Sequence, residues 1–126
     1  MMKLFLGLAG VSGFLSVALG AFGAHALKAK LSTEMMAVYQ TGIQYQQFHA
    51  LALLGVALLM NNHPSPSLTN AGWLFTAGTL IFSGSLYALA LTEVKILGAI
   101  TPIGGLAFLA GWACLIRAAL QQTASS

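Results

Sequence analysis

Charged residues are scarce in this 126-residue chain: they make up 6% of it, with five Lys and Arg and two acidic residues. A soluble domain usually carries about 25% charged residues, and a small domain has a large surface to cover with polar groups. Because so few charges cannot cover that surface, much of it is expected to contact lipid. The bases form no polybasic run, which argues against a nucleic-acid partner.

Patterns typical of catalysis are also absent from the sequence. Its acidic residues, Glu34 and Glu93, are far apart, and it has no nucleophile elbow, phosphate-binding glycine loop or metalloprotease motif. Cys114 is the single cysteine, which excludes an internal disulfide. Histidines without a neighbouring carboxylate or thiolate make a poor zinc site. We therefore predict a non-enzymatic protein with no catalytic residues, no metal and no cofactor.

Hydrophobic residues make up 58% of the chain and gather in stretches close to the roughly 20 residues that a membrane span requires. The stretches cover residues 4–24, 43–60, 72–91 and 96–116. Their apolar residues do not alternate with period two, and helices satisfy their own backbone hydrogen bonds in lipid. The sequence therefore predicts an all-α integral membrane four-helix bundle, with residues 1–126 as a single four-span domain.

The first stretch also has features of a signal peptide, because Lys3 precedes an apolar run and Ala24-His25-Ala26 fits a cleavage pattern. The run is long for a secretory signal, so we expect it to be retained as a span.

Two features shape the predicted helices. Ser32, Thr33 and Glu34 can cap a helix that continues to about residue 60, about 40 Å long, so that it extends beyond the hydrocarbon into the interface. Pro102 falls inside the fourth stretch and is expected to kink that helix.

Four spans place both termini on one side of the membrane. Lys3 and Arg117 share that side, and three lysines lie on the other: Lys28, Lys30 and Lys95. The positive-inside rule therefore favours termini outside, by one lysine.

Small residues at four-residue intervals form one face of the first span: Ser12, Ser16, Gly20 and Ala24. Such a face allows another helix to approach closely, which suggests a homo-oligomer. Trp73 and Trp112 fall near predicted span ends, as aromatics at membrane interfaces often do.

Polar residues gather at the beginning of the second span, where Thr41, Tyr45 and His49 share one helical face. Polar groups at membrane depth are costly unless they bond to one another. We predict a hydrogen-bonded network of His25, Tyr45 and His49, which Ser83 and Tyr87 could join. The network would either fix the register of the helices or form a small-ligand or lipid pocket or a proton path.

Four ordered motifs resemble a known family: residues 20–28 (GAFGAHALK), 41–53 (TGIQYQQFHALAL), 82–87 (FSGSLY) and 98–105 (GAITPIGG). They are similar to those of the YgdD-like group of small bacterial membrane proteins, which is related to animal transmembrane protein 256. The resemblance implies a four-span protein of the bacterial cytoplasmic (inner) membrane with its first span retained. It implies no established activity.

Two functional hypotheses follow. In the first, the protein packs or binds through its bundle, in contact with membrane lipids, as a homo-oligomer or an accessory subunit. In the alternative, it is a carrier or channel component, or a lipid or small-ligand binder, that uses the region around His25, Tyr45 and His49. A continuous wet cavity that reaches both histidines would favour conduction.

Overall fold

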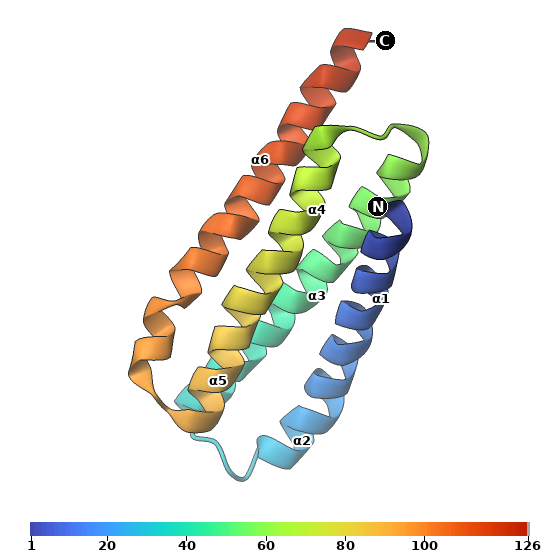
Figure 1. Ribbon diagram of the computed structural model, residues 1–126. Coiled ribbons are helices and arrows are strands. Elements are labelled where there is room, and N and C mark those ends of the chain that lie inside the picture. The colour runs from blue at the N-terminus through green and yellow to red at the C-terminus, as the bar shows by residue number, and fades with distance from the viewer. Residues whose placement is uncertain (126) are drawn as a thin grey trace.

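The computed structural model describes residues 1–125, which are helical apart from short connections. Four helical segments are long and apolar enough to cross a membrane: Met2–Leu27, Thr33–Asn62, Pro66–Thr92 and Lys95–Gln122. They lie side by side as a bundle (Figure 1). The predicted all-α four-helix fold is therefore confirmed.

Two of the four segments contain a turn of π-helix. The first comprises α1 (Met2–Ala18), the π-helix η1 (Leu19–Gly23) and α2 (Ala24–Leu27), and the third comprises α4 (Pro66–Gly78), the π-helix η2 (Thr79–Ser83) and α5 (Gly84–Thr92). The second is the unbroken α3 (Thr33–Asn62), and the fourth joins the 3₁₀-helix η3 (Lys95–Ala99) to α6 (Thr101–Ser125). The hydrophobic pattern does not predict these π turns.

The beginning of α3 follows from its cap. The Ser32 hydroxyl accepts a hydrogen bond from the Met35 amide at 3.1 Å, and Glu34 lies in the positively polarised first turn. The helix has 30 residues. At 1.5 Å per residue it is about 45 Å long, so it extends beyond a hydrocarbon core of about 30 Å, as predicted.

Pro102 lies in the first turn of α6 and not in the interior of a helix. The 3₁₀-helix η3 ends at Ala99, Ile100 forms a turn, and α6 begins at Thr101. Proline suits the first turn because an amide hydrogen there has no helical partner to lose. The discontinuity expected at Pro102 therefore occurs just before it, and the proline starts a new helix.

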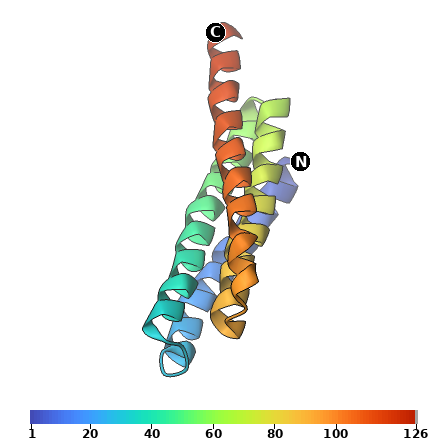
Figure 2. The ribbon, with the colours of Figure 1, turned by 90° about the vertical axis from the view of Figure 1, so that its left-hand side faces the viewer.

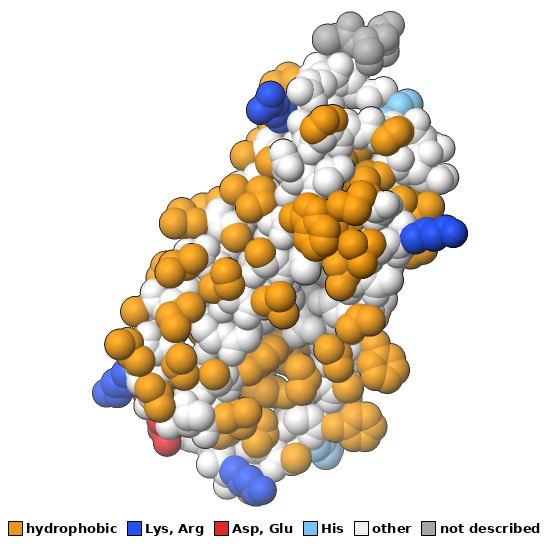
Figure 3. Space-filling model, viewed as in Figure 1, with side chains coloured by type: hydrophobic (Ala, Val, Ile, Leu, Met, Phe, Trp, Pro, Cys, Tyr) orange, Lys and Arg blue, Asp and Glu red, His pale blue; other side chains and the backbone are white. Residues whose placement is uncertain are grey.

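The helix α3 runs between α1 on one side and the α4–α5 segment on the other, while α6 packs against α4 and η2 (Figure 1, Figure 2). The main buried cluster lies among α1, α3, α4 and α6, and includes Phe5, Leu53, Val56, Phe75 and Phe108. Large apolar side chains also cover much of the outer surface (Figure 3). That distribution suits a bundle surrounded by lipid.

The small-residue face of α1 packs against α3 of the same chain. Ser16 is only 1% exposed, and a Cβ at Gly20 would lie 3.3 Å from the Ile43 side chain. The side chain of Ala24, the last member of the predicted stripe, lies outside the described part of the structure. The described part of this face is therefore used inside the monomer, and the homo-oligomer hypothesis loses the motif that suggested it.

The beginning of α1 and the end of α6 lie at the same end of the bundle (Figure 1). An even number of membrane spans requires this arrangement.

Candidate functional site

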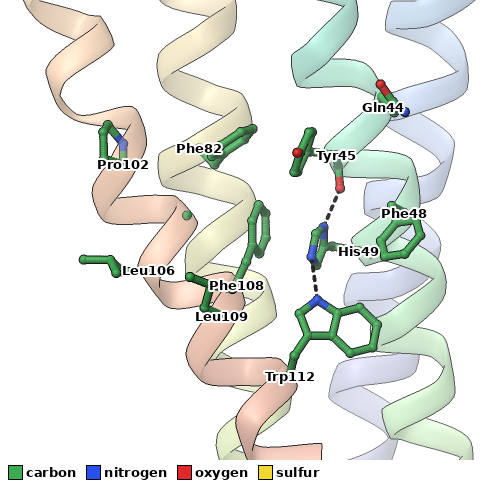
Figure 4. A pocket seen from close by; sticks show the side chains of 11 residues that line it. Gln44, Tyr45, Phe48, His49, Phe82, Pro102, Leu106, Phe108, Leu109 and Trp112 are labelled. Carbon is green, nitrogen blue, oxygen red and sulfur yellow. Dashed lines mark hydrogen bonds between the residues drawn. The ribbon is translucent and has the colours of Figure 1, made fainter.

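His49 lies at the centre of the candidate site, 4% exposed, on the middle of α3. The Trp112 indole N–H donates to its Nε2 at 3.1 Å, and its Nδ1 lies 2.8 Å from the Tyr45 carbonyl oxygen (Figure 4). An indole can only donate and a carbonyl can only accept. Nε2 is therefore unprotonated and Nδ1 carries the hydrogen, so the imidazole is neutral with both nitrogens engaged.

Aromatic rings enclose this imidazole. The Phe108 ring stacks on it with centroids 3.6 Å apart and planes within 9° (Figure 4). Phe48, Phe75 and Trp112 lie around it with centroid distances of 5.4, 5.5 and 5.8 Å. Stacked and edge-on rings of this kind hold a buried side chain in one orientation.

A groove of about 770 Å³ opens beside the stacked pair, between α3 and α6. Figure 4 shows the side chains that line it. The groove is lined by Gln44, Tyr45, Phe48 and His49 of α3, by Phe82 of η2, and by Pro102, Gly105, Leu106, Phe108, Leu109 and Trp112 of α6. Its rim includes the exposed Phe48, Leu106 and Leu109. The surface that it offers is mainly aromatic and aliphatic.

Two consecutive glycines of α6 shape the floor of the groove. A Cβ at Gly104 would lie 2.4 Å from the backbone nitrogen of Phe82, so only glycine permits this contact between α6 and η2. At Gly105 a Cβ would meet only the Phe82 ring, at 3.9 Å. The first glycine therefore brings the helices together, and the second leaves the groove open.

A separate polar cluster connects α1, α3, η2 and α5. The Gln46 amide donates to the Ser12 carbonyl at 3.0 Å and accepts from the Tyr87 hydroxyl at 2.5 Å. The Ser83 hydroxyl donates to the Gly42 carbonyl at 2.7 Å. Because each of these bonds joins different helices, this cluster fixes the packing of the bundle.

The predicted network of His25, Tyr45 and His49 is wrong in its membership. His25 is exposed on α2 at one end of the bundle, whereas His49 lies sixteen residues into α3, about 24 Å along that helix. The connection between α2, which ends at Leu27, and α3, which begins at Thr33, is too short to bring His25 back to the depth of His49. The two histidines therefore do not line one cavity, and conduction loses the feature that would have favoured it.

The other predicted residues divide between the two clusters. Tyr45 joins the groove, where its ring lies 4.5 Å from that of Phe82, while Ser83 and Tyr87 join the polar cluster. Thr41 donates to the Ala37 carbonyl of its own helix at 3.0 Å and joins neither.

Gln46 and Trp112 belong to these clusters, although the sequence pattern does not predict them there. Gln46 could have been found, because it lies in the polar run and an amide can bond two neighbours at once. Trp112 was expected at an interface but bonds to His49 in the middle of the bundle. The spacing of residues in the sequence does not report how α6 is rotated, and this rotation brings Trp112 to His49.

The fold and the site together define a small multi-pass membrane protein with a lateral groove. The chain matches the family model described as "Protein of unknown function (DUF423)" over residues 19–105. The chain therefore belongs to this family of membrane proteins, and the predicted resemblance is confirmed. No solved structure matches it.

Several curated relatives are similar along nearly their whole length. The UPF0382 membrane protein YwdK of Bacillus subtilis is 47% identical over 95% of this chain and 98% of its own. A UPF0382 membrane protein of Staphylococcus epidermidis is 47% identical over 95% of this chain and 98% of its own. The UPF0382 inner membrane protein YgdD of Escherichia coli is 45% identical over 90% of this chain and 86% of its own. With four apolar helices, these names place the protein in the bacterial inner membrane.

Proposed function

We propose that the protein is a non-enzymatic binding protein whose groove between α3 and α6 accepts a lipophilic ligand from the bilayer. The groove itself carries the proposal: its volume of about 770 Å³ falls within the range of about 300–1,000 Å³ typical of small-molecule sites. Its exposed rim residues lie on the sides of two membrane helices. A molecule dissolved in the bilayer could therefore enter sideways, without crossing water.

The walls indicate the chemistry of that ligand. His49 and Trp112 bond to each other, so they offer ring faces and not free polar atoms. The side-chain amide of Gln44 and the hydroxyl of Tyr45 make no hydrogen bond within residues 1–125, and they are polar groups of the lining that can meet a ligand. These features favour a ring-bearing apolar molecule with one polar substituent, because aromatic faces pack well on flat rings.

The test uses Trp112 as a reporter in nanodiscs, in a Trp73→Phe background that leaves it as the single tryptophan. Bromonaphthalene represents a ring ligand and dibromostearate represents a simple chain, and both quench indole fluorescence on contact. We expect bromonaphthalene to quench Trp112 saturably. Gly105→Phe should abolish the saturable part, because its ring would fill the groove.

The matched control is Gly10→Phe on α1, since a Cβ there has no neighbour within 4 Å and the position is exposed. It should leave the saturable quenching unchanged. Quenching that rises linearly with added compound and survives Gly105→Phe would mean that the groove holds ordinary lipid and binds nothing specific.

A further inference from the structure

Three glutamines lie exposed along one face of α3: Gln40, Gln44 and Gln47. Within residues 1–125 none of their side-chain amides makes a hydrogen bond. Gln44 and Gln47 lie roughly 15 Å or more along the helix from Glu34 and roughly 20 Å or more from Asn61. With a hydrocarbon core of about 30 Å, both amides fall inside it. Unbonded amides at that depth are costly and point to a missing partner.

The same face continues toward the other end of α3 with apolar residues. Leu51 and Leu58 are 69% and 59% exposed, and a Cβ at Gly55 would have no neighbour within 4 Å. Together with the glutamines they follow one another at intervals of three or four residues, the spacing of residues along a helix–helix contact. We name this surface the α3 seam: Gln40, Gln44, Gln47, Leu51, Gly55 and Leu58.

We propose that the α3 seam binds a second copy of this chain, with the two α3 helices side by side about a twofold axis along the bilayer normal. A primary amide both donates and accepts, so glutamine is complementary to glutamine. A twofold axis in this direction brings each residue opposite its own copy at the same depth. Acyl chains have neither donors nor acceptors, so lipid cannot satisfy these amides, whereas amide pairs do hold membrane helices together.

Cysteine cross-linking in bilayers tests the position of the contact. In a Cys114→Ala background, Leu51→Cys places a thiol on the seam and keeps all three glutamines. Leu80→Cys is the matched control, because Leu80 is 72% exposed and lies on η2, outside the seam. We expect oxidation to give a disulfide-linked dimer from Leu51→Cys and little from Leu80→Cys.

Removing the amides tests what holds the contact. Gln44→Leu combined with Gln47→Leu should leave the monomer folded, because it deletes unbonded polar groups. It should weaken dimerisation at least about tenfold, which corresponds to about 1.4 kcal/mol, when single-molecule photobleaching counts the copies in liposomes. Gln47→Asn keeps an amide and should retain most of the association.

The proposal fails if Leu51→Cys and Leu80→Cys cross-link equally, or if Leu51→Cys links only to a different protein. It also fails if the double leucine variant dimerises as well as the wild type. Gly105→Phe should leave dimerisation unchanged, because Gly105 lies in the groove and outside the seam. Gln44 belongs both to the seam and to the lining of the groove, whereas Leu51 and Gln47 lie outside the groove. Leu51→Cys and Gln47→Leu therefore report on the seam independently of ligand binding in the groove.

Discussion

The contact between α6 and η2 at Gly104 gives the most direct test of the packing. A Cβ at this position would lie 2.4 Å from the Phe82 nitrogen and 2.8 Å from its Cα, whereas ordinary contacts begin at 3.4 Å. Both atoms belong to the backbone, so no side chain can rotate away. Gly104→Ala must therefore push α6 outward by about 1 Å, which is a form of overpacking.

The magnitude follows from two opposing effects. Overpacking costs about 1–3 kcal/mol, and a clash with backbone belongs in the upper part of that range. Alanine recovers up to about 1 kcal/mol because it favours the helix more than glycine does. We therefore expect Gly104→Ala to lower the free energy of unfolding by about 1–2 kcal/mol.

The neighbouring glycine supplies the control. A Cβ at Gly105 would meet only the Phe82 ring at 3.9 Å, so Gly105→Ala should be neutral or stabilise the protein by up to about 1 kcal/mol. Reversible unfolding in mixed micelles measures both variants under the same conditions. If Gly104→Ala is as stable as Gly105→Ala, α6 does not lie against η2 as described. The contact between Gly104 and the Phe82 backbone would then not form the floor of the groove.

Two further predictions concern hydrogen bonds between helices. Gln46→Leu should lower the free energy of unfolding by about 1–3 kcal/mol because it leaves the Tyr87 hydroxyl without its acceptor, and adding Tyr87→Phe should recover part of that loss in a double-mutant cycle. For His49, ¹⁵N NMR should show the tautomer protonated at Nδ1, and Trp112→Phe should shift the Nε2 resonance as its donor is lost; an Nε2–H tautomer in the wild type would contradict the indole bond.

Local chemistry made much of the fold predictable. Apolar stretches of span length predict membrane helices, and the hydroxyl of Ser32 predicts where α3 begins, because both effects act within a few residues. The π turns at Leu19–Gly23 and Thr79–Ser83 have no counterpart in the hydrophobic pattern, which continues through both segments. The pairing of Trp112 with His49 depends on the rotation of α6 against α3, which no pattern within one helix reports.

The polar run at the beginning of α3 divides among several partners, and this division bears on function. Successive residues of a helix point about 100° apart, so the polar run from Thr41 to His49 cannot face a single partner. Gln46 faces the bundle interior, Gln47 faces outward, and His49 lies against the groove. The same substitution at adjacent positions should therefore have different effects. Gln46→Leu should destabilise the monomer, whereas Gln47→Leu should leave its unfolding unchanged and weaken only association between copies, which unfolding and photobleaching measure separately.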